Sequence, residues 1–208
     1  SESERWVRDS YQSSIITVSE QVMQKIAYGQ SDRGVVAEFQ SPQWDLSSLK
    51  LPDQGLVLVL DQIEKPGNIG AAFRCADAVG VDAIILTPSS ADRFNPNAIR
   101  GSLGAVFCVP SATADEAAAR NWLNKRGYRL CAARVESSRP LWDCDLTGAL
   151  AVIIGNEAEG LRDNWQADDE HAIDAIRIPM AGRVDSLNAS VSAAVILYEA
   201  RRQRSPAD

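Results

Sequence analysis

Short apolar runs, each followed by a polar loop and then by helical periodicity, recur along the chain. The clearest run is Leu56–Leu60 (LVLVL), which is too short for a stable helix and is typical of a strand buried on both faces. Residues 62–70 contain one proline and two glycines, which interrupt regular structure and allow a tight turn. Apolar residues recur at helical spacing from Ile69 until Gly80 closes the predicted helix, and residues 81–86 predict a second strand. This stretch therefore predicts a βαβ unit.

The same alternation continues to the end of the chain. Further strands are predicted at residues 105–109, 128–133, 150–154 and 175–178. Pro110 is expected to stop the first of these, Pro96 can begin a short helix, and Thr113 is a candidate helix N-cap. Longer helices are predicted over residues 115–126 and about 187–204. Strands and helices that alternate in this way predict an α/β domain with a mainly parallel, six-stranded sheet flanked by helices.

Residues 1–39 form a weaker unit. They contain an amphipathic segment at residues 17–27 and a strand-like segment at residues 34–39, and fewer than about 40 residues rarely fold alone. We expect an arm that packs on the main domain, or the remnant of a small domain. Residues 40–54 have the proline and serine content of a linker, and residues 55–204 are expected to form the main domain.

Composition places the chain among ordinary globular proteins. Its 208 residues are 45% hydrophobic, which is enough to bury a substantial core. The chain begins without an apolar signal region, and no run approaches the roughly 18 apolar residues of a membrane helix, so we expect a cytoplasmic protein with no membrane partner. The four cysteines lie far apart without paired spacing. We therefore expect buried free thiols rather than disulfides or a zinc site, and no metal.

The single histidine and the net charge restrict the chemistry. His171 lies in a polar run and is expected to be solvated. A Ser-His-acid triad or a multi-histidine metal site would need this residue at its centre, and no nucleophile turn or ligand pair lies nearby. The net charge of -7 disfavours the simplest kind of nucleic-acid binder, although a local basic patch can override a global sign.

Three polar loops follow predicted strands, at residues 62–70, 155–160 and 179–188. In an open parallel sheet this edge is where ligands bind, although glycines there can also serve only to permit turns. The loops at residues 62–70 and 155–160, which contain two glycines each, match neither G-x-G-x-x-G nor a complete P-loop. Dinucleotide and ATP binding are therefore disfavoured.

Several polar residues in or beside these loops have both a structural and a chemical interpretation. Asn68 can simply serve its turn, and Glu157 can cap the helix that follows. Ser186 and Asn188 can cap the last helix. Arg74 fits a structural role least well, because a helix of otherwise small and apolar residues gains little from it.

Three segments together resemble a known family. PGNIGAAFRCADAVG (66–80), IIGNEAEGL (153–161) and IPMAGRVDSLNASVSAAVILYE (178–199) are similar to the successive motifs of the SpoU/TrmH family of RNA ribose 2'-O-methyltransferases, within the SPOUT superfamily. IRGSLGAVFCVP (99–110) is similar to the segment between the first two motifs. The similarity covers about residues 55–204, in family order. Residues 1–39 resemble only the last helix and strand of the small RNA-binding domain that many members carry in front.

The resemblance implies a C-terminal deep trefoil knot, a cleft for S-adenosylmethionine, a homodimer, and a structured ribosomal or transfer RNA as substrate. Positions that match the cofactor-binding residues are Gly155, Asn156, Glu157, Ile178, Met180, Leu187 and Asn188. Positions that match the catalytic residues are Asn68, Arg74, Glu157, Ser186 and Asn188. Two departures are slight, since Cys75 stands where threonine is common and Asn156 where serine or alanine is frequent.

The resemblance also implies a role for Arg74. Methyl transfer from a sulfonium requires alignment with a ribose oxygen and loss of the hydroxyl proton, and it requires no metal. A guanidinium with a pKa above about 12 is a poor base near neutrality. We therefore expect Arg74 to stabilise the developing oxyanion or to hold the adjacent phosphate, and a deprotonated Arg74 is the alternative.

Two other functions stay open. A catalytically silent RNA-binding dimer of the same fold differs from the enzyme in cofactor binding, and the retention of every polar motif residue disfavours it. A Rossmann-type oxidoreductase lacks its glycine fingerprint here and predicts affinity for NAD. A titration with S-adenosylmethionine and NAD separates these possibilities.

Overall fold

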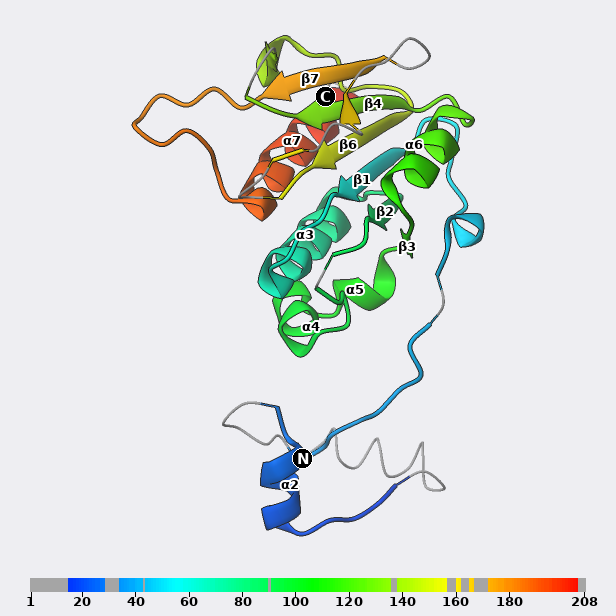
Figure 1. The fold of residues 1–208 in the computed structure, drawn as a ribbon, viewed down its shortest axis with the longest axis vertical. Coiled ribbons are helices and arrows are strands. Elements are labelled where there is room, and N and C mark those ends of the chain that lie inside the picture. Colours follow the sequence, from blue (N-terminus) through cyan, green and yellow to red (C-terminus); the bar gives the residue numbers. More distant parts are fainter. Residues whose placement is uncertain are drawn as a thin grey trace. The chain divides into compact units, whose positions relative to one another are not determined.

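The computed structural model describes residues 15–28, 34–42, 44–89, 91–135, 138–156, 160–161, 165–166 and 172–205 (Figure 1). The chain divides into two compact units, Ser1–Pro42 and Gln43–Asp208. No helix in the described ranges is long and apolar enough to cross a membrane.

The first unit contains the short helix α2 (Glu20–Ile26), which agrees with the amphipathic pattern at residues 17–27. Ser19 caps this helix by accepting a hydrogen bond from the Val22 N–H at 3.4 Å, and no helix residue is buried. Residues 34–39 form no strand, so the expectation of a strand there is wrong. A strand needs a neighbour for its backbone hydrogen bonds, and the described part of this unit supplies none.

A seven-stranded sheet organises the second unit. Its strands are β1 (Leu56–Leu60), β2 (Ala83–Leu86), β3 (Ser111–Thr113), β4 (Arg129–Ala133), β5 (Arg139–Pro140), β6 (Leu150–Ile154) and β7 (Ile173–Arg177). They lie in the order β3-β2-β1-β6-β4-β7-β5, and every neighbouring pair is parallel. The predicted α/β class and parallel sheet are confirmed. The predicted count of six strands is wrong, because two-residue β5 is too short to leave a hydrophobic pattern.

Helices flank this sheet on both faces. They are α3 (Pro66–Val79), α4 (Pro96–Ser102), α5 (Ala105–Cys108), α6 (Glu116–Asn124) and α7 (Ala189–Arg204), with 3-10 turns at η2 (Leu46–Ser48) and η3 (Leu141–Asp143). Pro66 lies in the first turn of α3, where its missing N–H has no intrahelical partner to lose. Gly80 ends the helix in the left-handed conformation with φ 78, as the pattern predicts.

Alternate residues of the strands contribute to two separate hydrophobic cores. Leu56, Leu58 and Leu60 of β1 belong to the core under α3, α4, α5 and α7. Val57 and Val59 belong to the core under α6 on the opposite face (Figure 1). Because successive strand side chains point to opposite faces, a sheet covered on both sides requires an unbroken apolar run. All five residues of β1 are at most 3% exposed.

The segment predicted as a third strand is helical. Ala105 and Val106 in α5 are buried and the next two residues are exposed, a pattern that fits one helical turn and not the alternation of a strand. The third strand, β3, instead follows Pro110, whose carbonyl accepts a hydrogen bond from the Ile84 N–H at 2.9 Å. Pro110 therefore leads into a strand rather than stopping one.

Several other boundaries differ from the predictions. Thr113 lies in β3, and the N-cap of α6 is Asp115, whose Oδ1 accepts a backbone N–H at 2.7 Å. Strand β7 begins earlier than predicted, because polar Asp174 is accommodated in it at 3.3 Å from Arg139. It also ends earlier, so Ile178 lies in the following loop.

Candidate active site

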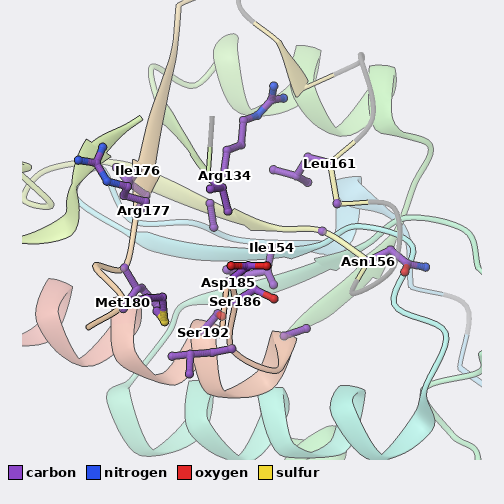
Figure 2. Close-up of a pocket in the computed structure, with 17 residues that line it drawn as sticks. Arg134, Ile154, Asn156, Leu161, Ile176, Arg177, Met180, Asp185, Ser186 and Ser192 are labelled. Carbon is purple, nitrogen blue, oxygen red and sulfur yellow. The ribbon is translucent and has the colours of Figure 1, made fainter. Parts of the chain in front are cut away.

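A pocket of about 390 Å³ lies where β4, β6 and β7 end (Figure 2). These strands are parallel neighbours, so their carboxyl ends share one edge of the sheet, which is the usual ligand site of such folds. The lining comes from residues 133–135 after β4, from the turn after β6, and from the stretch that runs from β7 into α7.

One wall is the glycine turn, which we define as Gly155, Asn156, Gly160 and Leu161. Asn156 and Gly160 form an antiparallel bridge, in which the Gly160 N–H donates to the Asn156 carbonyl at 2.9 Å. A Cβ on Gly155 would lie 2.5 Å from the Gly160 carbonyl oxygen, so this position has room only for glycine. Glu157 lies outside the described residues.

The opposite wall is the long loop, residues 178–188. Ile178, Met180, Ser186 and Leu187 line the pocket, and Asp185 joins them. Residues 179–187 are mostly exposed and make no hydrogen bond with the rest of the described chain. Figure 2 shows Asp185 and Ser186 near Ile154, in the middle of the lining. The two walls thus differ in how they are held.

Two predicted site residues from different motifs meet beside this pocket. Asn188 Nδ2 donates to Asn68 Oδ1 at 3.1 Å. Asn68 lies in the first turn of α3, and Asn188 caps α7 by accepting from the Ser190 N–H at 3.0 Å. The packing of α3 against α7 brings these helix starts together. Asn188 is therefore both a helix cap and the partner of the first motif.

Arg74 lies on the exposed side of α3, next to buried Phe73. It does not line the pocket, and it makes no hydrogen bond or ion pair with another described residue. Burial raises the pKa of the neighbouring Cys75 thiol, and the positive charge of Arg74 opposes that rise. Nothing in the described packing requires an arginine at this position.

The end of β4 contributes a part of the pocket that the sequence analysis does not identify: Ala133, Arg134 and Val135. The Arg134 N–H donates to the Ile176 carbonyl at 2.8 Å, and its guanidinium donates to the Trp165 carbonyl. Arg177 and Asp185 are likewise lining residues that were not predicted as site residues. No motif marks the end of β4, and only its position between β6 and β7 brings it here.

The cysteines are free, as predicted, but not all are buried. Cys131 and Cys144 are buried, whereas Cys108 is exposed, because it lies on the outer side of α5 rather than in a strand. Burial raises the pKa of the Cys131 thiol to about 12, so this thiol is protonated near neutrality. Within the described ranges, no group of three or more His, Cys, Asp or Glu side chains could hold a metal ion. His171 lies outside those ranges.

Comparison with known proteins places this architecture among RNA-modifying enzymes. The model of the SpoU rRNA Methylase family matches residues 55–198. The chain is 36% identical over 194 residues to the 23S rRNA (guanosine-2'-O-)-methyltransferase RlmB of Xylella fastidiosa (strain 9a5c), covering 90% of this chain and 77% of that protein. It is 33% identical over 176 residues to the 23S rRNA (uridine(2479)-2'-O)-methyltransferase of Streptomyces viridochromogenes, covering 82% of this chain and 60% of that protein.

A solved structure shows the same fold with a ligand bound. The SpoU methyltransferase AviRb from Streptomyces viridochromogenes, in complex with the cofactor AdoMet, matches with a TM-score of 0.84 and 28% identity. The match covers 96% of this chain and 78% of that chain. The likeness therefore extends over nearly all of the present sequence.

Proposed function

The chain belongs to the SpoU rRNA methylase family, and from that premise we propose that it transfers a methyl group from S-adenosylmethionine to a ribose 2'-hydroxyl of ribosomal RNA. One observation carries the proposal: residues of the second and third motifs form opposite walls of one pocket, at the edge where parallel sheets bind ligands. Both named relatives methylate 23S rRNA, which favours ribosomal over transfer RNA as the substrate class.

The pocket suits S-adenosylmethionine in size and lining. Its volume of about 390 Å³ falls within the range of small-molecule sites, and its lining combines apolar side chains, polar side chains and the glycine turn. When bound, the cofactor supplies an electrophilic methyl group, so the chain has to align it and exclude water. We assign its binding to Gly155, Asn156, Glu157, Ile178, Met180, Leu187 and Asn188.

Polar groups at the starts of α3 and α7 are assigned to the acceptor ribose. Asn68 and Asn188 present a paired amide, and Ser186 an exposed hydroxyl. Arg74 is assigned to stabilising charge on the ribose oxygen or holding the next phosphate, since a guanidinium stays protonated near neutrality. Glu157 completes the proposed catalytic set by its match to the family motif.

We also propose a homodimer built on α7. One face of this helix is buried in its own domain, whereas Val191 and Tyr198 are 45% and 53% exposed on another. A second copy would remove this apolar surface from water. Light scattering should return a dimer mass over a wide concentration range, and a monomer mass throughout would contradict the proposal.

Finer features of the chain are proposed as well. The second and third motifs are proposed to thread a trefoil knot, and the chain is proposed to act in the cytoplasm. Residues 1–39 are proposed as an arm or remnant of a small RNA-binding domain and residues 40–54 as a linker. The first of these ranges contains helix α2, which has no buried residue.

The test of function is the Arg74→Ala variant in single-turnover methylation of unmodified 23S rRNA transcript with methyl-labelled cofactor. Loss of a charge-stabilising donor predicts a fall of roughly two orders of magnitude in rate. Melting temperature and cofactor affinity should change little, because Arg74 is exposed and makes no hydrogen bond or ion pair with another described residue. Digestion of the product should release a 2'-O-methylated nucleoside.

Two further variants complete this experiment. Arg74→Lys should restore little activity, because an ammonium lacks the planar fork of donors. Lys50→Ala removes an exposed cation from the linker and should leave the rate unchanged. Near-normal turnover in Arg74→Ala would remove Arg74 from the mechanism, and a thermal shift with NAD but not with S-adenosylmethionine would overturn the proposed function itself.

A further inference from the structure

A buried carboxyl group lies just after β1, at a residue that does not itself line the pocket. Asp61 is only 1% exposed, and its N–H donates to the Ile154 carbonyl at 2.8 Å, just before the glycine turn. Its Oδ1 accepts from Thr87 Oγ1 at 2.7 Å. Burying a carboxyl group costs free energy unless the group is hydrogen-bonded. The proposed methyl transfer does not use it.

Thr87 connects this carboxyl to the next residue. A hydroxyl has one proton, and Thr87 donates it to Asp61 while accepting from the Gln62 N–H at 2.9 Å. Gln62 is held in the left-handed region with φ 52, which non-glycine residues rarely adopt. Its side-chain amide also donates to Glu116 Oε1 at 2.5 Å. We call Asp61, Gln62 and Thr87 the Asp61 cluster.

The backbone of Gln62 contacts the glycine turn. Its carbonyl accepts from Asn156 Nδ2 at 3.1 Å, so the cluster holds a residue of the glycine turn across 94 positions of sequence. Asn156 in turn accepts the Gly160 N–H in the bridge that shapes this wall. The cluster therefore holds the start of the turn.

The chain beyond the turn contacts the pocket lining at Arg134. Trp165 is fully buried in the core under α6, and its carbonyl accepts a hydrogen bond from the Arg134 guanidinium. Burial raises the pKa of Asp61, and the hydrogen bond from Thr87 opposes that rise. The link between the Asp61 carboxyl and the turn therefore runs through Thr87 and Gln62.

We propose that the Asp61 cluster positions the glycine turn by holding its start through Asn156. The proposal rests on the proposed function only in naming S-adenosylmethionine as the ligand that this wall receives. None of the three cluster residues lines the pocket. They are positioning residues that act through the turn and do not touch the ligand.

The test is Thr87→Val, which removes the hydroxyl at nearly constant volume and leaves both of its partners unsatisfied. We expect the KM for S-adenosylmethionine to rise about tenfold, with kcat nearly unchanged. A tenfold change corresponds to the loss of about 1.4 kcal/mol of binding free energy. Thr87→Ser keeps the hydroxyl and should restore the wild-type KM. Thr113→Val, at an exposed threonine on β3, is the matched control and should leave KM unchanged.

A readout without ligand separates this inference from the proposed function. In the free protein, the Gly160 amide should exchange hydrogen about tenfold faster in Thr87→Val, because the turn has lost its support. Gln62→Gly keeps the carbonyl and relieves the left-handed strain, so it should retain slow exchange and normal affinity.

The outcomes are distinct. Unchanged Gly160 exchange in folded Thr87→Val would overturn the inference, and so would a fall in kcat with KM unchanged. If Thr87→Val does not fold, wild-type exchange and affinity in Gln62→Gly would support the proposed carbonyl contact, and their loss would overturn it. Two results together would support the positioning role while overturning the proposed function. Gly160 exchange would be faster in Thr87→Val, and the wild-type protein would bind no S-adenosylmethionine.

Discussion

The two walls of the pocket differ in the contacts that hold them in place. The glycine turn is held by a backbone bridge, by the close approach of Gly155 to Gly160, and by the hydrogen bond from Asn156 to Gln62. The long loop, residues 178–188, is anchored at its far end, where Asn188 caps α7. Between residues 179 and 187 it makes no hydrogen bond with other described residues.

This difference assigns different tasks to the walls. A turn that is supported before the ligand arrives sets where the ligand binds, because little ordering entropy is lost there. An exposed loop with few hydrogen bonds opens locally at low free energy and becomes ordered by what it binds.

Gly155→Ala should have the largest effect. Its Cβ would lie 2.5 Å from the Gly160 carbonyl oxygen, and overpacking costs about 1–3 kcal/mol, so cofactor affinity should fall roughly 10- to 100-fold. Gly182→Ala is the matched control in the long loop, because its Cβ meets no atom within 4 Å. Calorimetric titration should place this variant within about twofold of wild type. Equal losses in both variants would erase the contrast.

Cofactor binding should order the long loop more than the glycine turn. In hydrogen-exchange mass spectrometry, saturating S-adenosylmethionine should slow exchange in the loop by about tenfold or more, and in the turn by less than about threefold. The comparison requires peptides that report each wall separately. Stronger protection of the turn than of the loop would reverse the assignment of tasks.

Asn188→Ala should have a moderate effect on stability, because it removes the N-cap of α7 and the donor to Asn68 together. Loss of such a cap costs about 1 kcal/mol, measurable by urea denaturation. Asn188→Ser keeps a capping oxygen but is too short to reach Asn68. It should recover most of the stability while methyl transfer stays low. Recovery of both properties would show that the amide pair has no part in the reaction.

Glu199 lies outside both walls and should produce the smallest effect, confined to acid. Hydrogen bonds from Arg202 and Gln203 lower its pKa from 4.5 to about 2. A depressed carboxyl pKa stabilises the fold above about pH 4.5, and this contribution is lost as the pH falls toward 2. Glu199→Gln should flatten the decline in melting temperature over that window without changing cofactor affinity near neutrality. An unchanged slope would contradict the assignment.

The sequence alone determined the elements whose signal is local. Strand β6 occupies the predicted residues 150–154, and β1 matches its apolar run because burial on both faces allows no polar position. Gly80 ended α3 because only glycine enters the left-handed conformation without cost. The motif residues Gly155, Ile178 and Leu187 were identifiable as a set because their order along the chain resembles that of a family, and the pocket lining includes them.

Which of these elements are neighbours depends on the tertiary structure. An apolar run specifies that a strand is buried, yet any buried strand can pair with any other. The local sequence therefore does not specify the strand order that places β4 between β6 and β7. That order brings Arg134 to the pocket, and the packing of α3 on α7 joins Asn68 to Asn188. Residues 105–108 became a helix for the same reason, because burial of two adjacent side chains suited their neighbours better than alternation. In the sequence, Asp61 marks only the polar end of a strand. The support of the glycine turn by the Asp61 cluster depends on the Asp61–Thr87 and Gln62–Asn156 hydrogen bonds, whose partners lie 26 and 94 residues apart.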